Sequence, residues 1–187
     1  MATVPKVSLE YSDARRRQIL DGARRAFAHH GYEGATVVRL EESVGLSRGA
    51  IFSYFGSKWN LFYALAEEDQ HRVAELWLEE GFTAVLRWVL DQRPEWIGVY
   101  LEVHRQLRTN QSLREQWMRR SPDVNERLRA HVREQQERGE LRDDLSPDDI
   151  GRFLGLIIDG LVLNASVGAE YDLEALLKLI VAAIGPQ

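Results

Sequence analysis

Apolar residues recur at helical spacing along almost the whole chain, and no stretch alternates apolar and polar residues as a half-buried strand does. In the first periodic stretch, Ile19, Ala23 and Phe27 share one face, and the stretch ends at Gly31. Glycines, prolines and capping residues separate the later stretches. The pattern predicts an all-α protein with about nine helices. We expect them at residues 14–30, 37–44, 48–55, 58–80, 82–92, 95–108, 112–138 with a break near Pro122, 147–168 and 173–184.

The second and third predicted helices are short and are joined by a tight turn. Thr36 and Ser47 are suitable N-caps for them, and Gly45 supplies the backbone freedom that the turn needs. The first of the two helices is expected to turn Glu41 and Glu42 outward. This is the arrangement of a helix-turn-helix. A small packed helical hairpin has the same spacing, so the pattern alone leaves both interpretations open.

Charge is divided unevenly along the chain. Residues 1–60 carry a net charge of +3 and residues 61–187 a net charge of −8, within a total of −5. A basic segment ahead of an acidic remainder suggests a polyanionic partner, such as nucleic acid, for the first segment alone. The first residues lack the apolar stretch of a signal peptide, and no segment reaches the roughly 20 apolar residues of a membrane span. We therefore expect a cytoplasmic protein with no membrane partner.

The sequence contains no pattern typical of a catalytic or metal-binding site. The absence of cysteine excludes a disulfide scaffold, a thiol nucleophile and a zinc ribbon. The histidines stand at positions 29, 30, 71, 104 and 131, and none has a partner at the spacing of a helical metal site. Glycine-rich phosphate loops and the GxSxG nucleophile elbow are missing too. We expect no metal, no cofactor and no enzymatic activity.

Specific sequence runs favour the helix-turn-helix interpretation. The runs ARRAFAHHGYEGATV (23–37), GLSRGAIFSYF (45–55) and SK-x-x-L (57–61) resemble the DNA-binding domain of the TetR family of bacterial transcriptional regulators. The resemblance covers roughly residues 14–65. Within the family, the runs GYEGATV, RLEE, SRGAIF and QLRT are most similar to the actinobacterial aconitase repressors. The resemblance implies a repressor that binds a palindromic, inverted-repeat site on double-stranded DNA as a homodimer and is released by a small-molecule effector.

The resemblance also assigns roles to residues of the predicted helix-turn-helix. It implies phosphate contacts for Thr36, Ser47, Tyr54 and Lys58, and base contacts for Arg48, Gly49, Phe52 and Ser53. For Arg48, a bidentate contact to guanine and a contact to phosphate remain alternatives. Trp59 departs from the family pattern, in which an acidic residue follows the lysine. We expect a DNA-binding domain at residues 1–57, with a flexible arm at 1–11, and a helical effector-binding and dimerisation domain at 58–187.

Aromatic and basic side chains are interspersed in the C-terminal part of the chain. They fit an effector pocket between helices, although an ordinary helical core explains most of them as well. Arginines in a pocket favour an anionic ligand, because guanidinium pairs bidentately with carboxylate. The candidate ligand-binding residues are Trp96, Tyr100, His104, Arg108, Arg129 and His131. The aconitase-repressor resemblance implies a tricarboxylate such as citrate, with or without a divalent cation, and control of aconitase and central carbon metabolism.

The last two predicted helices carry more apolar surface than one buried stripe requires. Such a surplus near a chain end suggests a partner surface, which in the resembled family is a four-helix dimer interface. The candidate interface residues are Phe153, Leu154, Ile157, Leu161, Leu176 and Ile180. The alternative is that both helices are central to the core of a single chain. For the whole protein, the alternative function is a helical small-molecule-binding protein that does not read an operator.

Overall fold

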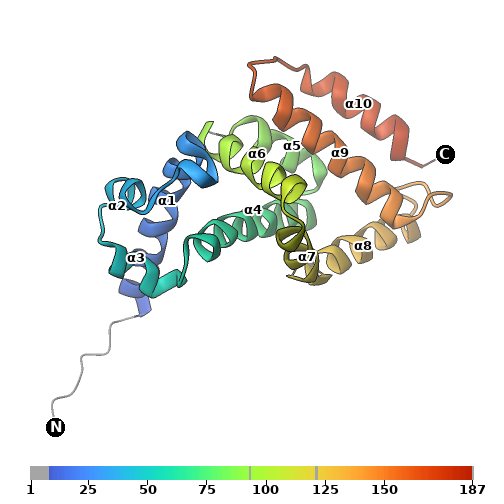
Figure 1. The fold of residues 1–187 in the computed structure, drawn as a ribbon. Helices are drawn as coiled ribbons and strands as arrows, with labels where there is room; N and C mark the ends of the chain where they lie inside the picture. Colours follow the sequence, from blue (N-terminus) through green and yellow to red (C-terminus); the bar gives the residue numbers. More distant parts are fainter. Residues whose placement is uncertain (1–8, 93, 121, 187) are drawn as a thin grey trace, which may run out of the picture. The chain divides into compact units, whose positions relative to one another are not determined.

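The structure, a computed structural model, describes residues 9–92, 94–120 and 122–186, and every regular element in these ranges is a helix (Figure 1). The all-α prediction is confirmed. The helices are α1 (Leu9–Gly34), α2 (Val37–Val44), α3 (Arg48–Phe55), α4 (Lys58–Glu80), α5 (Phe82–Leu90), α6 (Pro94–Thr109), α7 (Gln111–Arg120), α8 (Pro122–Glu137), α9 (Pro147–Ala165) and α10 (Leu173–Ile184). The helix expected over 112–138 is divided into α7 and α8, because a proline such as Pro122 has no N–H with which to continue a preceding helix.

The described chain forms two compact units. The first contains the residues up to Glu68 together with Pro94–Glu102, and the second contains the rest. Helices α4 and α6 therefore have residues in both units. The first unit extends past residue 57, the end expected from the sequence, because the first turns of α4 cluster with the N-terminal helices. The flexible arm expected at residues 1–11 lies outside the described residues as far as residue 8, and α1 already begins at Leu9.

In the first unit, α1 packs closely against α2. At Gly22 an added Cβ would lie 2.6 Å from the Cα of Val44, so glycine is required for this approach. The Gln18 side chain donates to the Val44 carbonyl at 3.1 Å, and the Ser43 hydroxyl donates to the Gly22 carbonyl at 2.8 Å. The apolar face predicted for α1 is buried. These contacts fix the position of the two short helices on α1.

Helix α1 bends at Gly31, where φ is 66° and ψ is 175°. Glycine adopts such a positive φ without the steric cost that a Cβ brings. Just beyond the bend, the ring of Tyr32 lies 5.2 Å from that of Phe62 and 5.9 Å from that of Trp59, between centroids. Trp59, which departs from the family pattern, is thus part of an aromatic cluster that packs the start of α4 against the end of α1.

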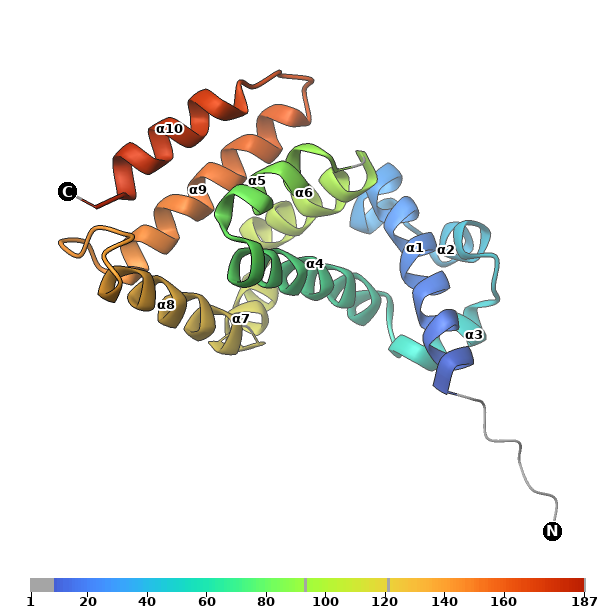
Figure 2. The same cartoon turned by 180° about the vertical axis from the view of Figure 1, so that it is seen from behind.

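In the second unit, α9 and α10 lie side by side in both views (Figures 1 and 2). The Ser146 hydroxyl caps α9 by accepting the Asp149 N–H at 3.1 Å. The loop before α9 is tied to the end of α10, since the Arg142 N–H donates to the Ile184 carbonyl at 3.0 Å. The Arg142 guanidinium also binds Asp144 with two hydrogen bonds of 2.6 Å and lowers the pKa of that carboxyl. The second unit therefore presents α9 and α10 as one layer.

Candidate nucleic-acid interface

The helix-turn-helix predicted from the sequence is present in the first unit. Gly45 adopts a left-handed conformation, with φ 74° and ψ 27°, and its N–H donates to the Glu41 carbonyl at 2.8 Å. The Thr36 hydroxyl accepts the N–H of the third residue of α2 at 3.4 Å, and the Ser47 hydroxyl accepts that of the third residue of α3 at 3.4 Å. Both predicted N-caps are confirmed. Ile51 is fully buried, which anchors α3 across α2.

Glu41 differs from the outward orientation expected from the sequence. The residue is half-buried, and its carboxylate accepts the backbone N–H of Arg48, the first residue of α3, at 2.6 Å. The start of a helix carries unpaired N–H groups and a partial positive charge, so a carboxylate is favoured there. Glu42 is exposed, as expected. Helix α2 thus supplies a second cap for α3, besides that of Ser47.

The residues expected to contact DNA lie mainly on exposed surface. Thr36, Ser47, Arg48, Gly49, Ser53 and Tyr54 are exposed, and Phe52 is half-buried. An added Cβ on Gly49 would have no neighbour within 4 Å, so the start of α3 is open to an approaching surface. The Ser53 hydroxyl donates to the Ala50 carbonyl at 2.8 Å and keeps both of its lone pairs available.

Lys58 has a different environment from these residues. Its ammonium donates to the Tyr32 carbonyl at 2.7 Å and lies 4.5 Å from the centroid of the Tyr32 ring. The Glu33 carbonyl is a more distant acceptor, at 3.5 Å. The structure therefore places the Lys58 charge against the end of α1, whereas the resemblance implies a phosphate contact.

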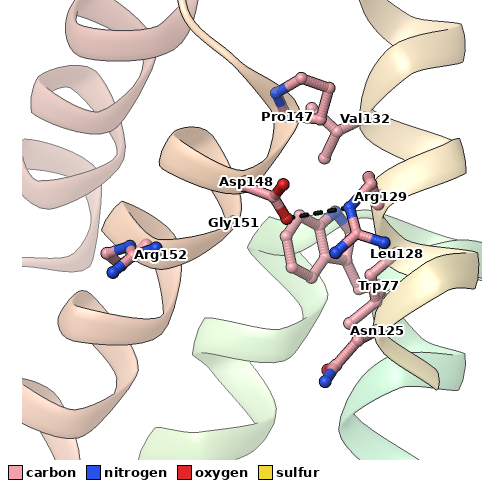
Figure 3. Close-up of a pocket in the computed structure, with 9 residues that line it drawn as sticks. All are labelled: Trp77, Asn125, Leu128, Arg129, Val132, Pro147, Asp148, Gly151 and Arg152. Atoms are coloured by element: carbon pink, nitrogen blue, oxygen red, sulfur yellow. Dashed lines mark hydrogen bonds and ion pairs between the residues drawn. The ribbon is translucent and has the colours of Figure 1, made fainter. Parts of the chain in front are cut away.

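The second unit contains a pocket of about 300 Å³ (Figure 3). Its walls come from α4, α8 and α9, and its lining residues are Trp77, Asn125, Leu128, Arg129, Val132, Pro147, Asp148, Gly151 and Arg152. The Arg129 Nε donates to Asp148 Oδ1 at 2.9 Å, and its Nη1 donates to Glu126. These hydrogen bonds raise the pKa of Arg129 above its usual value, and the bond to Asp148 contributes more than the bond to Glu126. The pocket thus combines an aromatic and aliphatic wall with a paired arginine and the exposed Arg152.

Of the candidate ligand-binding residues, the lining of this pocket includes Arg129 and none of the others. Trp96 and Tyr100 belong to the first unit, where their ring centroids lie 5.1 Å apart. His104 is exposed, with Nε2 3.6 Å from a carboxylate oxygen of Asp159. Arg108 is exposed, and His131 is half-buried on α8. This pocket therefore contains one residue of the predicted set, and a shared ligand site for the others stays a prediction.

The candidate dimer residues divide into two groups. Leu154, Leu161 and Ile180 are exposed by 2%, 3% and 5% respectively, so they belong to the core of the single chain. Phe153 is exposed by 37%, and Ile157 and Leu176 are half-buried. Large apolar side chains that the sequence interpretation omitted are more exposed: Leu156, Leu163, Leu179 and Val181, at 59–69%. A helix packed on one side hides its own core stripe, so the residues free to meet a partner lie on the opposite side.

Comparison with known proteins identifies the family. Residues 19–65 match the model described as bacterial regulatory proteins, tetR family, and residues 65–185 match the model described as BetI-type transcriptional repressor, C-terminal. The chain belongs to the TetR family. It is 43% identical over 168 residues to the HTH-type transcriptional repressor AcnR of Corynebacterium glutamicum, covering 88% of this chain and 89% of that protein. It is 42% identical over 180 residues to the AcnR of Corynebacterium diphtheriae, covering 95% of each.

The fold agrees with that of solved structures. Salmonella enterica GusR superposes with a TM-score of 0.78 over 95% of this chain and 97% of that chain, at 19% identity. TetR-family regulators bind DNA as dimers and also bind small molecules, and they are not enzymes. None of the helices in the described ranges combines the length and the hydropathy of a membrane span. The same residues include no group of three His, Asp or Glu side chains that could hold a metal ion.

Three features of this TetR-family chain were not predicted from the sequence. Glu41 resembles any exposed helical acid, and its contact with Arg48 depends on the angle between two helices. Asp148 and Arg152 stand four residues apart at the start of α9, a spacing that does indicate one helical face. The pairing of Asp148 with Arg129 joins residues 19 positions apart and had no local signal.

Proposed function

We propose that this TetR-family repressor binds an inverted-repeat operator as a homodimer through α3 of each subunit. The observation that carries the proposal is the exposed start of α3, fixed by two caps and headed by Arg48. Arg48, Gly49, Phe52 and Ser53 are assigned to base edges in the major groove. Thr36, Ser47 and Tyr54 are assigned to phosphates on either side of it.

Arg48 is the residue best suited to read a base. A guanidinium offers two parallel N–H donors that match the O6 and N7 acceptors of guanine. Gly49 leaves space beside it, so the backbone of α3 can approach the base edges closely. Hydroxyl groups such as those of Thr36 and Ser47 lie at helix starts, where backbone N–H groups favour phosphate.

The homodimer is assigned to the outer faces of α9 and α10. On α9, Phe153, Leu156, Gly160 and Leu163 follow one another at spacings of three, four and three residues, the period of packed helices. Gly160 has no neighbour within 4 Å of an added Cβ, so a second helix can approach there. This surface excludes Leu154, Leu161 and Ile180, which are buried in the core of the single chain. A second copy of the chain would cover it symmetrically.

The effector is assigned to the pocket beside Arg129. The relatives named AcnR, together with the arginines of the pocket, make a tricarboxylate such as citrate, with or without a divalent cation, the first candidate. Because Arg129 is already paired with Asp148, a ligand carboxylate has to replace that carboxylate or bind the exposed Arg152. The same relatives make aconitase and central carbon metabolism the first candidates for the regulated genes.

Selection of genomic fragments by the purified protein tests the operator proposal. The retained fragments should share an inverted repeat whose half-sites lie about one helical turn, or a multiple of it, apart. Arg48→Ala should retain fewer fragments, whereas Arg87→Ala, which removes an exposed charge from α5, should not. If the wild-type protein retains no fragment, the alternative of a small-molecule-binding protein that does not read an operator is favoured. Equal retention by the wild type and Arg48→Ala would overturn the role of Arg48 alone.

A further inference from the structure

Residues 31–34 link the bend of α1 to the cap of α2, and side chains of two other helices bind the backbone of this segment. We propose that Glu102 of α6 and Lys58 of α4 are positioning residues. They bind the N–H and the carbonyl of Tyr32, respectively, and so hold the helix-turn-helix in its DNA-binding conformation. This inference rests on the proposed DNA-binding function. All of the residues involved belong to the first unit.

Glu102 is a buried charged residue to which the proposed DNA contacts give no role. Its side chain belongs to a residue only 8% exposed, and its Oε1 accepts the Tyr32 N–H at 2.8 Å. The bend at Gly31 takes that N–H out of the regular helical pattern, so it needs another acceptor. A carboxylate meets this need with a charge-assisted hydrogen bond. The hydrogen bond from the Tyr32 N–H to Glu102 thus replaces the backbone hydrogen bond that the bend removes.

A close contact one helical turn away holds α6 on α1. An added Cβ on Gly98 would lie 3.0 Å from both the Cα and the Cβ of Ala28, so the two backbones nearly touch. Gly98 and Glu102 are four residues apart on α6, as Ala28 and Tyr32 are on α1. Helix α6 therefore meets α1 at two successive turns, which fixes the carboxylate of Glu102 opposite the bend.

Lys58 holds the other side of the same residue. Its ammonium donates to the Tyr32 carbonyl at 2.7 Å and lies 4.5 Å from the ring centroid. Carbonyls at the end of a helix carry partial negative charge, and an aromatic face attracts a cation. The N–H and the carbonyl of Tyr32 are thus bound from α6 and from α4, respectively.

These two hydrogen bonds connect α6 and α4 directly to the segment that precedes the helix-turn-helix. Helices α4 and α6 each have residues in both units, and both hold Tyr32. Tyr32 stands four residues before Thr36, the cap of α2. A displacement of either helix would therefore move the start of the helix-turn-helix.

The test combines amide hydrogen exchange with DNA titration on the full chain. Glu102→Ala should speed exchange at Tyr32 by about 5- to 150-fold, the range expected when a buried donor loses its acceptor. It should also weaken binding to a selected genomic fragment. Glu102→Gln retains an acceptor oxygen and should restore slow exchange at Tyr32 and the affinity for DNA. Glu102→Asp, which keeps the charge, replaces the alanine variant in these measurements if the latter does not fold. Glu33→Gln, an exposed acid on the same segment, is the control.

Lys58 is tested by the salt dependence of DNA binding. If it positions Tyr32, Lys58→Met should weaken binding at every salt concentration and leave the salt slope unchanged, and Lys58→Arg should recover part of the affinity. A fall of the slope by about one unit, with unchanged exchange at Tyr32, would identify a phosphate contact and overturn the proposal. So would normal DNA affinity in Glu102→Ala. If the wild type retains no fragment, the proposed function is wrong, while hydrogen exchange still decides whether the two side chains hold Tyr32.

Discussion

The carboxylate of Glu41 in α2 accepts the backbone N–H of Arg48, the first residue of α3, at 2.6 Å. This bond crosses the turn of the helix-turn-helix and joins the two helices directly. Together with the Ser47 hydroxyl, it binds two of the N–H groups that the start of α3 leaves unpaired. The residue proposed to read a base is therefore held in place from its backbone, and its side chain extends from a fixed point.

Loss of this bond should loosen α3. We expect Glu41→Ala to lower the free energy of unfolding by about 0.5–2 kcal/mol, the usual cost of losing a helix cap. Glu42→Ala removes an exposed acid of the same helix and should change it by less than about 0.5 kcal/mol. Urea denaturation followed by circular dichroism measures both. Equal effects of the two substitutions would show that the Glu41 contact does not stabilise α3.

Arg48 should contribute sequence preference as well as affinity. We expect Arg48→Ala to weaken binding to the selected site by about 1–3 kcal/mol and to relax the preference at one base position. Binding titrations against fragments that carry each base at each position measure this. A uniform loss across all fragments would instead assign Arg48 to a phosphate, the alternative that the sequence leaves open.

The helix-turn-helix could be predicted because its signals are local. Thr36, Gly45 and Ser47 each act on residues within one helical turn, and each has the predicted role in the structure. The contacts of Glu41, Lys58 and Arg129 could not be predicted in this way, because each joins residues brought together by the packing of helices. The lining of the pocket beside Arg129 could not be predicted for the same reason: charge and aromatic character indicate suitable side chains without indicating which ones meet.

The outer face of α9 should be required for the dimer. An unpaired carboxylate buried in an apolar interface is strongly disfavoured, so Leu156→Asp and Leu163→Asp should each yield folded monomers. Leu161→Asp places the same charge in the core of the single chain and should unfold it. Sedimentation velocity and circular dichroism distinguish the two results. A folded dimer of the Leu156→Asp, Leu163→Asp double variant would place the interface elsewhere.

The pairing of Arg129 with Asp148 should oppose the binding of an anionic effector. A carboxylate ligand gains the guanidinium of Arg129 only by replacing the carboxylate that lies 2.9 Å from it. Both side chains are partly exposed, so solvent screens the pair and the competition is weak. Asp148→Asn should therefore lower the citrate concentration that releases DNA by a small factor. Arg129→Ala should raise that concentration, whereas Arg108→Ala, an exposed arginine that does not line the pocket, should leave it unchanged.

Because binding free energies are linked, citrate and DNA must weaken each other's binding by one common factor, in the wild type and in each variant. If citrate weakens DNA binding, DNA must weaken citrate binding equally, with a coupling of about 1–3 kcal/mol. Calorimetric titration of citrate, with and without Mg²⁺ and with and without the DNA fragment, measures this factor independently. Citrate that releases wild type, Arg129→Ala and Asp148→Asn at one concentration would exclude this pocket as its site, while the roles of Arg48 and of the outer face of α9 would still rest on their own tests.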